Sequence, residues 1–159
     1  MKNVKFLLSA ALVFLASAAL AQDFSGPQYA KWGATPEERE QNILNSNFLK
    51  ESCDNRDYDA AAHYLKGLID KIPDAAESIY QRGAVVYKNK INRAKSVAEK
   101  NMFIDSLMLM YDMRAQYFGD NVKPGKTAFI LDQKAREFLR YKPNDRKGIR
   151  EAFRAAIAQ

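Results

Sequence analysis

The chain has 159 residues and a formal net charge of +6, because 25 lysine and arginine residues outnumber 19 aspartate and glutamate residues. It contains one cysteine, Cys53, which excludes an intramolecular disulfide, so an apolar core must stabilise the fold. The excess of positive charge is small, and the amino-terminal segment described next argues against genomic DNA as the binding partner.

The first 21 residues have the pattern of a secretory signal peptide. Two lysines precede an apolar run over residues 6–21, and Ala19 and Ala21 supply a small-x-small cleavage pattern, so we expect a mature chain that begins at Gln22. The alternative is an uncleaved membrane helix. The run is short for a membrane span and rich in small residues, so this alternative is less favoured. We therefore expect an exported protein, periplasmic or extracellular, with no nucleic-acid partner and no stable membrane span after cleavage.

The segment that follows the signal differs from the rest of the chain. Residues 22–34 carry Gly26, Pro27 and Gly33 and show no helical periodicity, which predicts an extended leader. The remainder, residues 35–159, shows helical periodicity throughout and is interpreted as one domain.

The first helix of this domain is indicated by its capping residues. Thr35 can cap it, Pro36 suits the first helical position, and Glu38 completes a capping box. Apolar residues then recur at helical spacing as far as about Cys53: Ile43, Leu44, Phe48 and Leu49.

Five further helices are predicted from apolar stripes, which lie in residues 64–72, 79–91, 102–118, 129–139 and 149–157. Pro73 ends the second helix, and the sixth begins at about Arg146. The fourth segment is apolar around more than half of its circumference, so we expect that helix to be central. No segment alternates with a period of two residues. The sequence therefore predicts an all-α protein of about six helices arranged as three hairpins.

Acidic residues concentrate in the turn DNRDYD, residues 54–59, between the first two helices. A calcium-binding loop that starts at Asn55 would need glycine at its sixth position and glutamate at its twelfth. Ala60 and Lys66 occupy these positions instead. An acid–base centre needs carboxylates in unlike environments, whereas these aspartates look equally solvated. We expect Asp57 or Asp59 to cap the second helix instead.

The segment DYDAAAHYLKGLIDKIP, residues 57–73, resembles the second half of a tetratricopeptide repeat. The family's positions fall on Asp57, Tyr58, Ala61, Leu65 and Pro73. The resemblance implies a stack of antiparallel helical hairpins, an α-solenoid, in which Tyr58 fills the corner of a hairpin and Ala61 lets its helices approach.

The resemblance extends in part to the neighbouring helices. Phe48 occupies the family's usual leucine position, and Gly83 occupies the small position of the next hairpin. Leu49 departs from the family, since it stands in a glycine position, and the later prolines do not keep the 34-residue period. The last stripe ends at Ile157 with no polar capping helix, so self-association through this uncapped helix is an open expectation.

The resemblance also implies a function. Such a stack would bind another envelope or secreted protein, or a peptide, on a concave face lined by the first helix of each hairpin. The positions that would line this face are Ser46, Lys50, Tyr80, Tyr87 and Lys88. The resemblance thus favours a protein-binding scaffold of the cell envelope, with no catalytic residue, metal or cofactor.

Two other classes of function remain open. A ligand-binding or enzymatic domain with its site between hairpins would need an enclosed cavity, and Cys53 and His63 lie on adjacent helices where a nucleophilic pair could form. A binder of anionic envelope surfaces would need a basic face without acidic neighbours. The methionines of the fourth helix are better explained as core than as a soft-metal strip.

Overall fold

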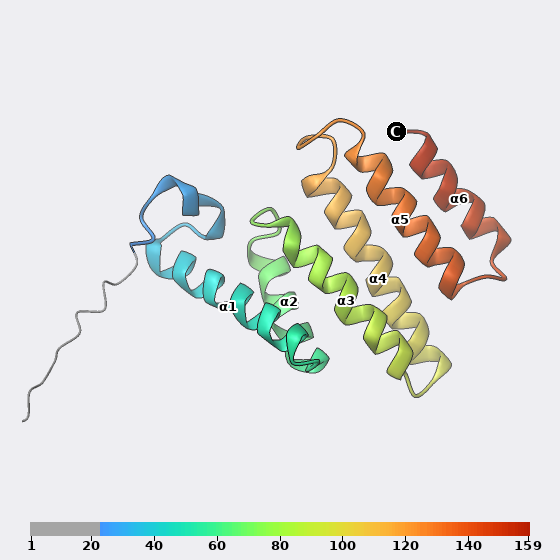
Figure 1. Ribbon diagram of the computed structural model, residues 1–159, viewed down its shortest axis with the longest axis horizontal. Helices are drawn as coiled ribbons and strands as arrows, with labels where there is room; N and C mark the ends of the chain where they lie inside the picture. Colours follow the sequence, from blue (N-terminus) through green and yellow to red (C-terminus); the bar gives the residue numbers. More distant parts are fainter. Residues whose placement is uncertain (1–22) are drawn as a thin grey trace, which may run out of the picture.

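The computed structural model describes residues 23–159 and is all-helical there, which confirms the predicted fold class. Within these residues six α-helices follow a 3-10 helix, and Figure 1 shows their arrangement. Their bounds are η1 (Pro27–Trp32), α1 (Pro36–Asp54), α2 (Tyr58–Lys71), α3 (Glu77–Arg93), α4 (Val97–Phe118), α5 (Lys126–Tyr141) and α6 (Arg146–Ile157). The signal-peptide prediction falls on residues 1–21, outside the described residues.

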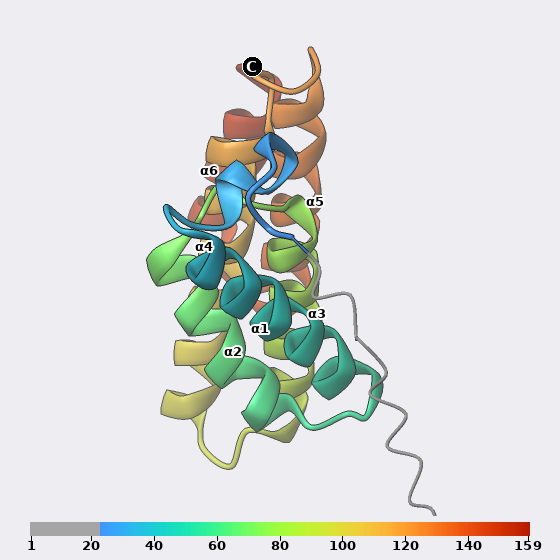
Figure 2. The same cartoon turned by 90° about the vertical axis from the view of Figure 1, so that its left-hand side faces the viewer.

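The helices form three antiparallel hairpins, α1 with α2, α3 with α4 and α5 with α6 (Figure 1). Each hairpin contacts the next, through α2 with α3 and through α4 with α5, and α1 also contacts α3. Figure 2 looks at the end that carries α1 and shows the other hairpins behind it. No helix within residues 23–159 combines the length and apolarity needed to cross a membrane.

The leader is not extended as predicted, because Pro27–Trp32 form the 3-10 helix η1. Proline at its first position fixes φ close to the helical value, and the Tyr29 amide donates to the Gly26 carbonyl at 3.0 Å. The Arg39 guanidinium of α1 then donates to the carbonyls of Phe24, Ser25 and Gly33 at 2.9–3.1 Å. The leader is therefore bound to the start of α1.

The predicted caps are confirmed. The Thr35 hydroxyl accepts a hydrogen bond from the Glu38 amide at 3.2 Å, and the Glu38 carboxylate accepts one from the Thr35 amide at 3.4 Å. Asp57 caps α2, with its carboxylate 3.1 Å from the Ala60 amide. Before it, Arg56 adopts a φ of 60° and its amide donates to the Cys53 carbonyl, which closes the end of α1 in the manner of a Schellman motif.

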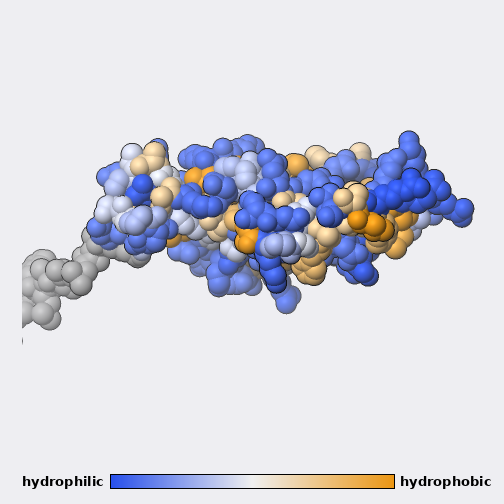
Figure 3. All heavy atoms as spheres, turned by 90° about the horizontal axis from the view of Figure 1, so that it is seen from above, coloured by the Kyte–Doolittle hydropathy of each residue, from blue (hydrophilic) through white to orange (hydrophobic). Residues whose placement is uncertain are grey.

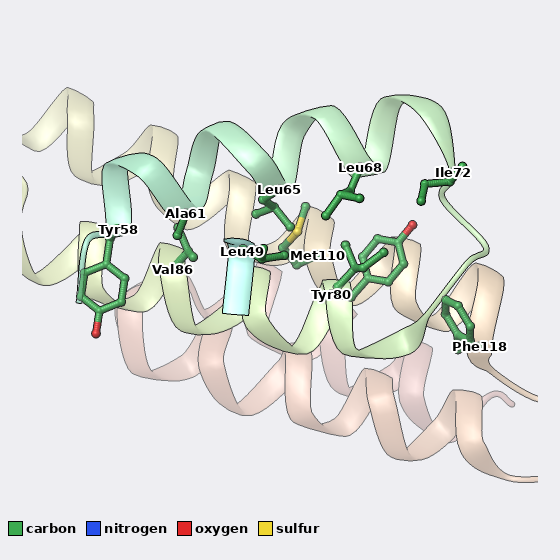
Figure 4. Packing of buried hydrophobic residues seen from close by; sticks show 11 residues of the cluster. Leu49, Tyr58, Ala61, Leu65, Leu68, Ile72, Tyr80, Val86, Met110 and Phe118 are labelled. Atoms are coloured by element: carbon green, nitrogen blue, oxygen red, sulfur yellow. The ribbon is translucent and has the colours of Figure 1, made fainter. Parts of the chain in front are cut away.

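The core of the described part of the chain consists of two apolar clusters. The first joins α1, α2, α3 and α4, and Figure 4 shows side chains of α2 and α3 meeting around Met110 of α4. The second joins α3, α4 and α5 around Leu107 and Ile130. Contacts with both α3 and α5 confirm that α4 is central.

The positions implied by the family resemblance are mostly buried. Tyr58 lies in the first cluster with its ring 5.0 Å from the Arg93 guanidinium, and Ala61 and Leu65 are fully or almost fully buried. Gly83 permits close packing, since a Cβ there would lie 2.7 Å from the Met110 sulfur. These positions support the hairpin interpretation of the α1–α2 corner.

Phe48 is the exception and corrects the predicted inner face of α1. Its side chain is 36% exposed and packs on Tyr64, with ring centroids 5.3 Å apart, and Leu44 is 42% exposed. Asn42 and Ser46 face inward in their place, together with Leu49, which belongs to the predicted apolar stripe. Burial of the polar Asn42 is possible because its amide donates to the Trp32 carbonyl of the leader at 2.7 Å.

Candidate functional site

An open groove lies between α1 and the start of α3, with a volume of about 240 Å³. Its polar and aromatic lining consists of Trp32, Ser46, Asn47, Lys50, Ser78 and Arg82. Two of the predicted partner-binding residues, Ser46 and Lys50, therefore belong to it. We call this hollow the α1–α3 groove.

Helical spacing places the groove residues on facing sides of two helices. Ser46 and Lys50 are four residues apart on α1, and Ser78 and Arg82 are four residues apart on α3. Residues at this spacing share one face of a helix. Trp32 is held at the rim because its carbonyl accepts the hydrogen bond from Asn42 of α1.

The charges of the groove are basic. Lys50 lies 2.7 Å from Asp54, but both side chains are more than half exposed, so this ion pair contributes little and can be exchanged for another. Arg82 has no carboxylate within 4.0 Å among residues 23–159. A guanidinium with free donors can bind a carboxylate through two parallel hydrogen bonds.

Tyr80 does not line an open face, which corrects the prediction. Its side chain is 1% exposed, and its hydroxyl donates to the Pro73 carbonyl at 2.6 Å. Burial is the main reason why the pKa of its hydroxyl lies well above the usual value, and the nearby Tyr117 and Asp74 raise it further. Tyr80 fastens the α2–α3 turn to the core.

Tyr87 and Lys88 lie farther along α3 and are not part of the α1–α3 groove. Tyr87 is half-buried between the two apolar clusters. The Lys88 ammonium is 2.5 Å from Glu137 of α5, whose side chain is only 11% exposed. Burial opposes the charge of Lys88, but hydrogen bonds to Glu137 and Tyr111 outweigh it and raise the pKa of the ammonium. Lys88 therefore joins two hairpins.

A second ion-pair cluster joins the same hairpins at the other end of α3. Glu77 accepts hydrogen bonds from Arg114 of α4 at 2.9 Å and from Lys126 of α5 at 2.6 Å. Arg114 also donates to Gln133 of α5 at 2.9 Å. Burial opposes ionisation of Glu77, but these bonds and charges outweigh it and hold the pKa of its carboxyl below the usual value.

The candidates for chemistry are not brought together. Burial raises the pKa of the Cys53 thiol, with the charge of Arg82 as a smaller opposing effect, and an un-ionised thiol is a poor nucleophile. His63 is exposed and packs edge-on against Tyr64. Within residues 23–159, no group of three or more histidine, cysteine, aspartate or glutamate side chains could hold a metal ion.

Each aspartate of the acidic turn has its own partner. Asp54 pairs with Lys50, Asp57 caps α2 and Asp59 pairs with Lys90 of α3. The bond from Lys90 holds the pKa of the Asp59 carboxyl below its usual value. The turn is therefore a structural corner, as the capping interpretation predicted.

No protein-family model, curated protein or solved structure matches the chain. The resemblance to tetratricopeptide repeats accordingly rests on the residues quoted above.

The sequence interpretation missed Trp32, Asn47 and Arg82. One signal was present, because the serine and basic residue at positions 46 and 50 recur at positions 78 and 82 with the same four-residue spacing. Two such pairs on the first helices of neighbouring hairpins would have indicated a shared groove.

Proposed function

We propose that the protein is an exported, non-catalytic binding or scaffolding module of the bacterial cell envelope, which holds a segment of a partner protein in the α1–α3 groove. The observation that carries this proposal is the pair of basic side chains, Lys50 and Arg82, set among hydroxyl and amide groups in an open groove. Arg82 in particular has no carboxylate partner within the described part of the chain.

The chemistry of the groove favours an acidic, extended segment. Arg82 can take a carboxylate in a bidentate geometry, and Lys50 can exchange its exposed bond to Asp54 for a carboxylate of the partner. Asn47 offers an amide for main-chain groups, and the half-buried Trp32 offers an aromatic face at the rim. Aromatic and arginine side chains contribute most to typical binding sites.

Export is proposed from the pattern of residues 1–21, which has a basic start, an apolar run and a small-x-small end. In an exported protein the partner is another envelope or secreted protein. The mass of the protein recovered from the envelope fraction tests this step, with a chain that begins at Gln22 expected and a chain that retains residues 1–21 contradicting it.

Affinity capture from the envelope of the producing cell tests the binding function. We expect one or more proteins with an acidic segment to be retained by the unaltered protein and released as salt increases, because exposed charge pairs are screened. The double variant Lys50→Glu, Arg82→Glu should lose them.

The matched control is Lys100→Glu, Arg150→Glu, which makes the same change of charge at exposed positions on α4 and α6. It should retain the same proteins as the unaltered chain. Equal retention by both double variants, or turnover of a small molecule with no protein retained, would show that the proposal is wrong.

A further inference from the structure

A second and larger hollow, of about 670 Å³, lies where α4, α5 and α6 meet. Each helix presents one face to it, since the lining residues recur at helical spacing from 105 to 112 on α4, at 134 and 138 on α5, and from 148 to 155 on α6. We call this hollow the α4–α6 groove. It shares no residue with the α1–α3 groove.

The floor of the α4–α6 groove is apolar. Phe138 contributes a half-buried ring, Met108 is almost buried, and Leu109 is 51% exposed. Met102, seven residues before Leu109 on the same face of α4, is 55% exposed. The space-filling view of one side of the molecule shows a mostly hydrophilic surface with separate apolar patches (Figure 3). Large exposed side chains gathered on one helix face are typical of an interaction surface.

The rim of the groove is acidic on both sides. Asp105 and Asp112 stand on the α4 side, and Asp145 and Glu151 stand on the α6 side. Lys134 is the one basic side chain in the lining and is bound to Asp112 at 2.5 Å. The four carboxylates and one ammonium give the groove a formal charge of −3, in a chain whose overall charge is +6.

The carboxylates differ in how far they are already engaged. One oxygen of Asp145 caps α6 at the Gly148 amide, 2.8 Å away. Glu151 has only a long and exposed contact with Lys147, at 3.9 Å. Asp105 has no ion pair within residues 23–159. Asp105 and Glu151 thus remain available to a cation from opposite sides of the groove.

We propose that the α4–α6 groove binds a basic amphipathic helix of a partner protein. The apolar side of that helix packs on Leu109, Met108 and Phe138, and its lysine or arginine side chains reach the acidic rims. A helix has the matching shape, because its apolar stripe is narrow and is flanked by polar positions on both sides. Charge complementarity on both rims fixes the orientation of the partner and speeds its association. This inference does not depend on the function of the α1–α3 groove.

The probe is a synthetic 18-residue helical peptide with leucine at the i, i+3, i+4 and i+7 positions and lysine elsewhere. Its binding to the full exported chain is measured by fluorescence anisotropy. A second peptide with glutamate in place of each lysine tests the charge. We expect the lysine peptide to bind, its affinity to fall as salt increases, and the glutamate peptide not to bind.

Groove variants localise the binding. Leu109→Asn and the double variant Asp105→Asn, Glu151→Gln should each weaken binding of the lysine peptide at least tenfold. Leu44→Asn and Glu40→Gln are control variants on α1, where the leucine is 42% exposed and both side chains lie outside the groove. They should leave the affinity unchanged, and Lys50→Glu, Arg82→Glu should retain binding of the lysine peptide.

Three results would overturn the proposal. The first is failure of the lysine peptide to bind, and the second is equal binding by the groove variants and their controls. The third is self-association, seen by light scattering, that Leu109→Asn abolishes while peptide binding is absent, which would assign the groove to a second copy of the chain. If Lys50→Glu, Arg82→Glu loses the partner of the α1–α3 groove but still binds the peptide, the two proposals can be tested separately.

Discussion

Gly83 shows how a single residue sets the distance between helices. It lies on α3 where Leu65 of α2 and Met110 of α4 meet, and a Cβ placed there would be 2.7 Å from the Met110 sulfur and 3.2 Å from the Leu65 methyl groups. Both neighbours are buried in the first apolar cluster, so a shift of either side chain would disturb its packing. The absence of a side chain at this position is therefore part of the packing.

We predict that Gly83→Ala lowers the free energy of unfolding by up to about 2 kcal/mol, because overpacking outweighs the roughly 1 kcal/mol that alanine gains over glycine in a helix. Gly67→Ala is the matched control, since a Cβ at that position of α2 has no atom within 4 Å. It should raise the free energy of unfolding by up to about 1 kcal/mol. Urea unfolding of both variants measures the difference, and a gain in both would refute the close packing at Gly83.

At the scale of the helices, part-buried ion pairs join neighbouring hairpins. Glu77 at the start of α3 accepts from Arg114 of α4 and Lys126 of α5, and Lys88 near the end of α3 binds Glu137 of α5. Both sites are less exposed than the surface pairs within single helices. Removing one partner of such a cluster leaves the others without a counter-charge, which costs more than loss of an exposed pair.

Glu77→Gln should therefore lower the free energy of unfolding by about 1–3 kcal/mol at pH 7. The pKa of Glu77 is lower in the folded protein than its ordinary value of 4.5, so the folded state favours the ionised form. The stabilisation is complete above that ordinary value and is lost as pH falls through the folded pKa. Urea unfolding at pH 7 and at pH about 3 should show a large effect of the variant at pH 7 and a smaller one in acid. An effect that grows in acid would contradict the assignment.

Local signals made the helices predictable, while tertiary contacts decided their faces. The capping box at Thr35 was identified, and the cap of α2 was narrowed to Asp57 or Asp59, because each depends on residues three positions apart. The inner face of α1 was misjudged because the burial of Asn42 depends on the Trp32 carbonyl of the leader. Tyr80 was misplaced because its hydroxyl partner is the Pro73 carbonyl, a contact that periodicity does not reveal.

The candidate site was predictable only in part for the same reason. Ser46 and Lys50 were found from the family resemblance, and they do line the α1–α3 groove. Arg82 was missed because its role depends on the position of α1 beside α3. Lys88 was predicted to line the partner-binding face, but its ammonium binds Glu137 of α5, away from the α1–α3 groove.

Two grooves of opposite charge lie in the part of the chain that the structure describes, one against α3 and the other against α4 of the middle hairpin. The α1–α3 groove offers Lys50 and Arg82, whereas the α4–α6 groove is rimmed by four carboxylates. Helix α3 connects the two regions, because it contacts α1 and α2 on one side and α4 on the other. Because the two grooves share no residue, the acidic segment and the basic helix proposed above would not compete for the same side chains.

Site-specific photocrosslinking in the producing cell tests the central claim most directly. A photoreactive residue in place of Asn47 lies in the α1–α3 groove, and one in place of Lys100 lies at an exposed position of α4 outside both grooves. Partner binding in the groove predicts a discrete adduct with an envelope protein from position 47, lost in the Lys50→Glu, Arg82→Glu background, and no such adduct from position 100. No adduct from position 47, or the same adduct from both positions, would contradict the account.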